Sequence, residues 1–204
     1  WAGMKPIQEI VESSATVDID PQGLQIVIPE FEMPPGGLHI RWPDDALAQE
    51  ARLFNYKWYA ALAYIRVNKI NHTVIKGAND RFGLIASGKA YNDTRQALQD
   101  LGLDDAACQR AGIRVHKVLA VWPLAPATVQ AFAKGLQEIV VVEEKRALIE
   151  PQIKDILYGL PDAERPRVVC KLNGDVLAPN AETLVRANAD LSASLVAQAL
   201  AKRV

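Results

Sequence analysis

The sequence predicts an α/β fold built on a parallel sheet. Between residues 72 and 171, short β-branched runs alternate with segments of helical periodicity, which is the order that right-handed crossovers between parallel strands produce. The runs LIA, VLAV and IVVV are apolar without polar alternation, as in strands that are covered on both faces. With 204 residues, half of them hydrophobic, the chain has ample material for such a core.

Residues 1–43 precede this unit as an irregular region. A short helix is expected up to residue 13, and the turn signal DPQG between ATVDID and LQIVI favours a β-hairpin in which Gly23 takes a positive φ. The Pro- and Gly-rich stretch EFEMPPGGLHIRWP then forms a connector that ends near Pro43. The opening residues WAGMKP look like the interior of a polypeptide, so we expect the chain to be a piece of a longer protein.

Residues 44–71 carry the longest periodic pattern. Apolar residues recur at spacings of four and three, which predicts one linking helix of about seven turns. Asp44 and Asp45 suit its N-terminus, where negative charge meets the helix dipole. Three tyrosines widen the apolar stripe, and packing on two sides explains them better than a ligand site. The stripe consists of Leu47, Ala51, Phe54, Trp58, Ala61 and Ile65.

Residues 72–172 hold the α/β unit, and residues 173–204 add a loop and a terminal helix. In that helix Leu195, Val196 and Leu200 form an apolar side for docking. The expected strands are HTVIK, RFGLIAS, IRVHKVLAV, EIVVV and RPRVVCKL, and the expected helices are KAYNDTRQALQDLG, LDDAACQRAG, residues 126–135, residues 146–158 and LSASLVAQALAKRV.

Composition excludes several classes of function. A net charge of −1, from 23 basic and 24 acidic side chains, gives no electrostatic sign of a nucleic acid or membrane partner, and a cytoplasmic location is expected. Cys108 and Cys170 are too few for a disulfide framework, a cysteine zinc site or an iron–sulfur cluster, so both are expected to be buried thiols. His39, His72 and His116 lack the spacing of a metal site.

Three strand ends are the candidate functional positions. In an open parallel sheet, ligands bind beyond the carboxyl ends of the strands, and here these ends read SGK, WPL and EEK. Under a functional interpretation they share a crevice for a phosphate-bearing ligand, in which a glycine permits close approach and a lysine reaches the anion. The candidate residues are Ser87, Gly88, Lys89, Trp122, Glu143, Glu144 and Lys145.

A structural interpretation of the same residues is simpler. Ser87 caps a helix, Trp122 begins a packed turn, and Glu143 and Glu144 place negative charge at the start of the next helix. Consecutive strand residues point to opposite faces, so the two carboxylates do not flank one substrate atom. The sequence contains no GxGxxG, GxxxxGK[ST] or GxSxG motif, and we therefore favour structural or domain-interface roles and expect no catalytic residue and no metal site.

Several long strings resemble the long-chain indolepyruvate ferredoxin oxidoreductases, which are thiamine-pyrophosphate-dependent 2-oxoacid:ferredoxin oxidoreductases. The strings span most of the chain between residues 16 and 170 and occur in order. They are PPGGLHIRWPD, QEARLFNYKWYAALAYIRVNKIN, ASGKAYNDTRQALQDLG, VWPLAP and VVVEEKRALIEPQIKDILYG.

The resemblance implies a middle piece of a multidomain enzyme, in which the residues before about Ser13 form the tail of the preceding pyrimidine-binding domain. Residues 72–171 are similar to the transketolase C-terminal domain, which implies a three-layer unit with five strands, one of them antiparallel. The full-length enzyme is implied to convert an aryl 2-oxoacid such as indolepyruvate to acyl-CoA, with thiamine pyrophosphate, magnesium, [4Fe-4S] clusters, ferredoxin and coenzyme A. The cluster motifs, the diphosphate-binding domain and the catalytic glutamate do not map to this chain.

The expected function is therefore a non-catalytic domain that packs against other domains of the same enzyme. Two alternatives stay open. One is a module that binds a phosphate ligand such as coenzyme A at the strand ends, and the other is a free-standing dimerisation domain that forms a homodimer.

Overall fold

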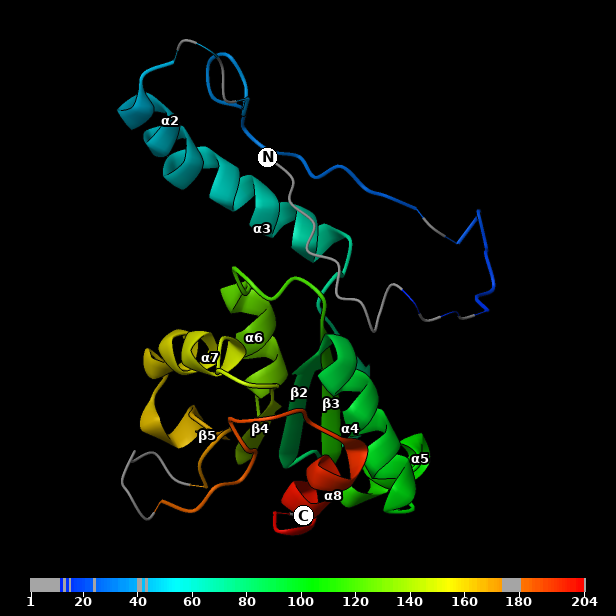
Figure 1. The fold of residues 1–204 in the computed structure, drawn as a ribbon. Helices are drawn as coiled ribbons and strands as arrows, with labels where there is room; N and C mark the ends of the chain where they lie inside the picture. Colours follow the sequence, from blue (N-terminus) through cyan, green and yellow to red (C-terminus); the bar gives the residue numbers. More distant parts are fainter. Residues whose placement is uncertain are drawn as a thin grey trace.

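A computed structural model describes residues 12, 14, 16–23, 25–39, 42, 44–173 and 181–203. Residues from His72 onward form one α/β unit, and a helix that precedes them lies beside the unit (Figure 1). The short helix expected before residue 13 falls outside the described residues.

The sheet has five strands in the order β1-β3-β2-β4-β5. Only β1 is antiparallel to its neighbour, and the other pairs are parallel. This confirms the expected mainly parallel sheet with one antiparallel strand. The strands are β1 (His72–Ile75), β2 (Phe82–Ser87), β3 (Ile113–Val118), β4 (Glu138–Val142) and β5 (Arg167–Val169).

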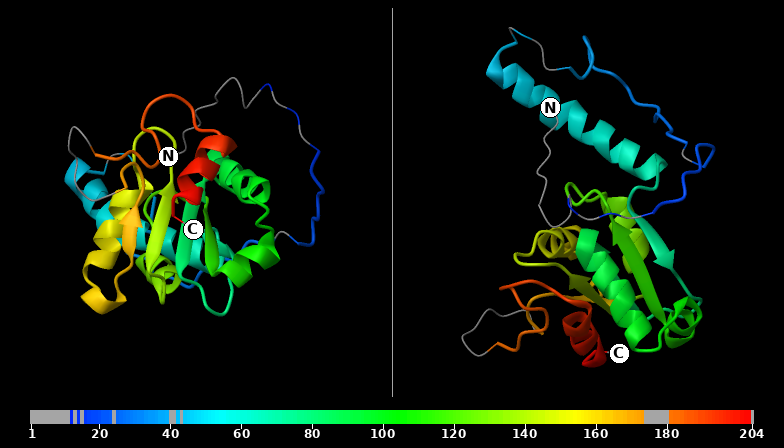
Figure 2. Two further views of the ribbon diagram at one scale, coloured as in Figure 1. Left: turned by 90° about the horizontal axis from the view of Figure 1, so that it is seen from below. Right: turned by 45° about the vertical axis from the view of Figure 1, so that its right-hand side comes forward.

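Helices cover both faces of the sheet, which gives the three layers (Figure 2). One core joins the sheet to α4 (Gly88–Asp100), α5 (Asp105–Ala111) and α8 (Ala193–Ala201). A second core, on the other face, joins it to α6 (Pro126–Ala133) and α7 (Ile149–Tyr158). All five side chains of β4 are buried, as the unbroken apolar run Ile139–Val142 predicts for four of them.

Local signals place the helix ends. Asp104 caps α5 by accepting from the backbone N–H of Ala107, and α5 ends at Gly112 with φ of 78°. A Cβ at Gly112 would lie 2.8 Å from the carbonyl oxygen of Asn79, so a larger residue would need both strain and displacement of backbone. Pro126 occupies the first turn of α6, where its missing N–H costs nothing.

The linking helix is present but interrupted. It consists of α2 (Ala46–Arg52), a π-helical turn η1 (Leu53–Lys57) and α3 (Trp58–Val67), and Asp45 caps its start by accepting from the Ala48 N–H. Much of its predicted stripe is exposed: Leu47 is 73% and Phe54 52% accessible, whereas Ile65 is buried. Periodicity thus predicted the helix but not the extent of its burial.

The hairpin predicted around DPQG is wrong. Residues 21–23 form the turn, but the described residues on either side form no strand, and the φ of Gly23 is not positive. The Asn68 side chain instead accepts from the Val27 N–H and donates to the Val27 carbonyl oxygen, each at 2.8 Å. A side chain at the end of α3 thus takes the backbone groups that a strand partner would use.

The terminal helix α8 docks onto the sheet, as its apolar side predicts. Val196 and Leu200 are fully buried in the core with α4. Near its end, Arg203 forms an ion pair with Glu138 at the start of β4, in which Nε donates to Oε1 at 2.7 Å. Within the described part of the chain, no helix has the length and apolar character that crossing a membrane requires.

Candidate functional site at the carboxyl edge of the sheet

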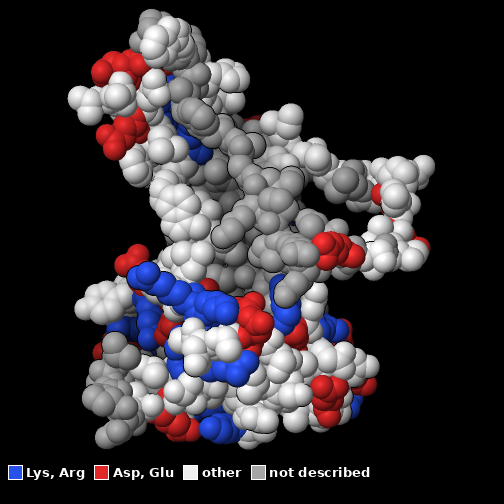
Figure 3. Space-filling model, in the orientation of Figure 1, with Lys and Arg blue, Asp and Glu red and all other residues white. Residues whose placement is uncertain are grey.

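The three predicted strand ends do lie along one edge. Because β2, β3 and β4 run parallel, their carboxyl ends meet at the side of the sheet that faces the linking helix (Figure 1). Basic and acidic side chains alternate across this upper part of the α/β unit (Figure 3). The question is whether these charges converge on a space for a ligand or bind one another.

Glu143 caps α7. Its Oε1 accepts from the N–H groups of Leu148 and Ile149 at 3.0 and 2.7 Å, and its Oε2 accepts from Glu150 N–H at 3.1 Å. The residue is buried, and three backbone donors with the positive end of the helix dipole compensate its charge. This carboxylate is therefore fully used within the fold, in the role that the structural interpretation predicts.

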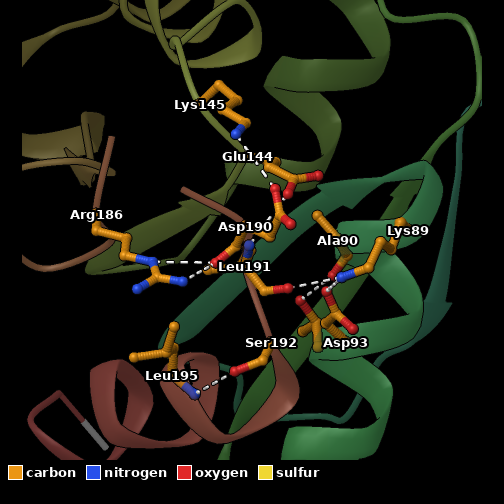
Figure 4. Close-up of polar contacts among 11 residues, drawn as sticks. Lys89, Ala90, Asp93, Glu144, Lys145, Arg186, Asp190, Leu191, Ser192 and Leu195 are labelled. Atoms are coloured by element: carbon orange, nitrogen blue, oxygen red, sulfur yellow. Dashed lines mark hydrogen bonds and ion pairs between the residues drawn. The ribbon is translucent and has the colours of Figure 1, made fainter. Parts of the chain in front are cut away.

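Glu144 points away from Glu143, toward the segment that leads into α8. Its Oε1 accepts from the N–H of Leu191 at 3.1 Å, and on the other side Lys89 Nζ donates to the Leu191 carbonyl oxygen at 2.6 Å. Figure 4 shows Leu191 between the two side chains. A lysine after β2 and a glutamate after β4 thus hold one peptide segment of the same chain.

Lys89 is also paired with Asp93 one turn along α4, at 2.7 Å. This hydrogen bond raises the pKa of Lys89, although partial burial opposes the rise. Lys145 forms a looser ion pair with Asp190 at 3.2 Å, and Arg186 Nε donates to the Asp190 carbonyl oxygen at 3.0 Å. Lys89 and Lys145, which the sequence analysis named as candidate anion ligands, therefore both form ion pairs within the chain.

Ser87 and Gly88 differ in part from expectation. Ser87 precedes α4 as its N-cap residue, but its side chain makes no capping hydrogen bond, so the predicted cap is wrong in that respect. Gly88 has φ of 52° with open space where a Cβ would stand, as close approach to its backbone requires. The glycine thus fits either interpretation.

Trp122 belongs to a turn that two distant side chains hold. The Trp122–Pro123 peptide is cis, and the Trp122 ring packs edge-on against Trp58 of α3 at 4.4 Å between centroids. Gln152 accepts from Leu124 N–H and donates to the Val121 carbonyl oxygen. Asn71 accepts from Leu119 N–H and Ala120 N–H, so the turn is fixed at both ends.

The edge therefore joins Lys89, Glu144 and Lys145 through residues 186–191, while Glu143 and Trp122 serve other elements. Sequence reasoning missed Arg186, Asp190 and Leu191. A signal existed in Ser192, which caps α8 by accepting from Leu195 N–H at 3.5 Å, because a cap fixes where the preceding segment must run.

The cysteines do not suit an iron–sulfur cluster. Cys108 lies in the core with α4 and α8, and Cys170 lies in the core on the opposite face of the sheet. Burial raises the pKa of both thiols, which disfavours the thiolate that ligates iron. Across the described ranges, no group of three or more His, Cys, Asp or Glu side chains is placed to hold a metal ion.

The fold and this edge define a three-layer α/β domain whose strand-end charges bind its own C-terminal segment. Comparison with known protein families identifies the domain more closely. The chain belongs to the indolepyruvate ferredoxin oxidoreductase middle domain family, whose sequence profile matches residues 71–204. It is thus a domain of an indolepyruvate or related 2-oxoacid ferredoxin oxidoreductase, as the sequence resemblance predicts.

Curated relatives agree with this family. The chain is 27% identical over 140 residues to the indolepyruvate oxidoreductase subunit IorA of Methanothermobacter thermautotrophicus, covering 62% of this chain and 21% of that protein. It is 31% identical over 81 residues to the IorA subunit of Pyrococcus abyssi, covering 39% and 11%. The chain therefore spans about a fifth or less of these relatives.

Among solved structures, the chain is similar to the 2-oxoglutarate:ferredoxin oxidoreductase from Magnetococcus marinus with 2-oxoglutarate, coenzyme A and succinyl-CoA bound. The match has 12% identity and a TM-score of 0.48, and it covers 89% of this chain and 27% of that one.

Proposed function

We propose that this chain is a non-catalytic domain that holds neighbouring domains of an indolepyruvate ferredoxin oxidoreductase in place. The whole enzyme would oxidatively decarboxylate an aryl 2-oxoacid to acyl-CoA, using thiamine pyrophosphate, magnesium and iron–sulfur clusters and passing electrons to ferredoxin. The family membership supports the reaction, and the chain itself supports the structural role. A cytoplasmic location and the domain boundaries stay predictions.

One observation carries the structural role. The acidic and basic side chains at the strand ends form hydrogen bonds within the chain. Glu143 accepts from backbone N–H groups at the start of α7, and Lys89 and Glu144 bind the backbone of Leu191. A general acid or base must instead reach a substrate proton at hydrogen-bond distance. A domain-packing role also needs exposed apolar surface, and the linking helix has it in Leu47 and Phe54.

The test compares activity with stability in the complete enzyme. We expect Glu144→Ala and Lys89→Ala to leave kcat/KM for indolepyruvate within about twofold, since neither group would touch substrate, while both lower the denaturation midpoint. Loss of a general acid or base costs about 100-fold or more. A loss of that size in folded enzyme would overturn the proposal.

The isolated chain provides a second test. Supplied with indolepyruvate, thiamine pyrophosphate, magnesium, coenzyme A and a viologen acceptor, it is expected to reduce no acceptor above the blank. Sustained turnover by this chain would contradict the non-catalytic role.

A coenzyme A site at the strand ends is the alternative. It would require residues 186–191 to leave Lys89 and Glu144, because the two side chains hold Leu191 from both sides. Calorimetry with coenzyme A and with thiamine pyrophosphate separates the two cases. Binding of coenzyme A that the substitution Lys89→Ala abolishes would favour the alternative. The absence of a heat signal at millimolar coenzyme A would exclude it.

A further inference from the structure

A basic groove lies along edge strand β1, away from the contacts described above. Its volume is about 460 Å³, and it runs between the end of α3, the strands β1 and β3, and one side of α6. Its charged and polar lining comprises Arg66, Lys69, Asn71, His72, Thr73, Lys76, Arg114, His116 and Thr128. Ala127, Ala131 and Phe132 add an apolar wall, and no aspartate or glutamate among the described residues lines the groove.

The layering of the fold leaves this groove open. Helices α6 and α7 cover the apolar side chains of β2, β4 and β5 on this face. On β3 the same face presents Arg114 and His116 instead, and on β1 it presents Thr73, whose hydroxyl lies 3.2 Å from His116 Nδ1. Arg114 and His116 are themselves buried beside Phe132 of α6, and buried polar groups of this kind require polar or charged partners.

Three cations at the rim have no counter-charge within the part of the chain that the structure describes. Arg66, Lys69 and Lys76 are exposed, and none forms an ion pair with a residue that the structure describes. In contrast, Lys89 and Lys145 at the strand ends are both paired. Like charges gathered without partners repel one another, so this arrangement favours an anion in the groove.

Arg114 gives the groove a rigid base. Its side chain is buried, Nε donates to Asp80 Oδ2 at 2.8 Å, and Nη1 donates to the carbonyl oxygens of Phe132 and Lys134. No described residue accepts from Nη2, so one nitrogen of a fixed guanidinium still has donor capacity. A preordered guanidinium loses little entropy when it binds a phosphate or carboxylate oxygen.

We propose that this groove binds a small phosphorylated ligand, with the phosphate held by Arg114 and the rim cations. The volume falls in the range of small-molecule sites and exceeds one phosphate, so the rest of the ligand would contact Ala131 and Phe132. The first turn of α6 borders the groove at Ala127 and Thr128, where the helix dipole adds positive potential. Phosphate is preferred to a single carboxylate because three cations without ion-pair partners among the described residues face the same space as the Arg114 guanidinium.

Calorimetry on the 204-residue chain tests the site with pyrophosphate and adenosine diphosphate, and with adenosine as the uncharged comparison. We expect the two phosphates to bind and adenosine to give no signal. Arg66→Ala with Lys69→Ala is expected to weaken phosphate binding at least about tenfold, since hydrogen bonds to charged groups contribute that much each. Amide NMR shifts are expected to concentrate at Thr73, Lys76 and Thr128.

The matched control is Arg110→Ala with Arg146→Ala, which removes the same charge from two exposed positions outside the groove. Circular dichroism spectra establish that both double variants fold. Equal weakening in the two pairs would mean general attraction of anions and would overturn the proposal. The absence of a binding signal with both pyrophosphate and adenosine diphosphate at millimolar concentration would also overturn it.

Discussion

The strand-end edge and the β1 groove contain the same kinds of side chain but use them differently. At the edge, each lysine and glutamate has an intrachain partner, and Lys89 and Glu144 together hold the backbone of Leu191. In the groove, Arg114 is anchored by Asp80 while Arg66, Lys69 and Lys76 have no ion-pair partner among described residues. The comparison teaches that charged side chains at strand ends do not by themselves indicate a ligand-binding site. A segment distant in the sequence, here residues 186–191, can take up the hydrogen bonds that a ligand would need.

The largest expected effect is at the base of the groove. Asp80→Ala removes the only carboxylate that pairs with Arg114 among the described residues, and it leaves a buried guanidinium uncompensated. Breaking such a pair costs about 3–5 kcal/mol of unfolding free energy, measured by urea denaturation. If the variant keeps full stability, the base of the groove is less rigid than the contacts indicate.

Acid is expected to destabilise the fold through His116, which lines the groove. Burial, with a smaller contribution from His72, lowers the pKa of His116 to about 4 from its ordinary 6.5. The unfolded chain then binds more protons between these values, so stability is present above pH 6.5 and is lost as pH falls toward 4, by about 3 kcal/mol.

His116→Gln removes this titration while it keeps a polar group beside Thr73. Urea denaturation at pH 7 and pH 4.5 is expected to show a smaller loss on acidification in the variant than in the parent chain. An identical pH dependence in both proteins would contradict the shifted pKa.

The largest effect at the edge concerns Glu143. Glu143→Ala leaves the N–H groups of Leu148, Ile149 and Glu150 without their acceptor, at the buried start of α7. We expect a loss of about 2 kcal/mol in unfolding free energy. Glu143→Gln keeps one acceptor oxygen and is expected to recover part of this loss, whereas equal losses would assign the effect to packing.

The smallest effects concern the exposed ion pairs at the edge. Lys145 and Asp190 are both largely exposed, so Lys145→Ala is expected to change stability by less than about 0.5 kcal/mol. Lys89→Ala also loses the bond to the Leu191 carbonyl oxygen and is expected to cost up to about 1 kcal/mol, since solvent screens its ion pair with Asp93. A larger loss of thermal stability in Lys145→Ala than in Lys89→Ala would contradict the prediction that the bond from Lys89 to the Leu191 backbone contributes more than an exposed ion pair.

Sequence predicted what depends on local pattern. The β-branched runs gave the five strands, and Gly112 and Pro126 gave helix ends. It failed where a distant side chain intervenes, because Asn68 takes the backbone groups of Val27. It also placed the start of α7 near Arg146 instead of at Ile149, although it assigned Glu143 to that helix start. The contact between Asn68 and Val27 leaves no local signal, because 41 residues separate the two.

The groove did leave a signal that was not used. In IRVHKV, Arg114 and His116 alternate with Ile113 and Val115, so one face of an otherwise buried strand is polar. Alternation of this kind predicts that the two faces of β3 have different neighbours, and Arg114 and His116 are in fact buried together beside Phe132 of α6. The pairing of that face with β1 and with the end of α3 depends on topology, which the alternation does not contain.

The packing of Trp58 against Trp122 provides an intrinsic spectroscopic probe of the position of the linking helix. The two indoles lie 4.4 Å apart between the linking helix and the turn after β3, while Trp42 is almost fully exposed. Near-ultraviolet circular dichroism of this pair responds to their mutual orientation. Any protein domain that binds the linking helix and tilts it would therefore change the near-ultraviolet circular dichroism spectrum, and no added label is needed to detect this.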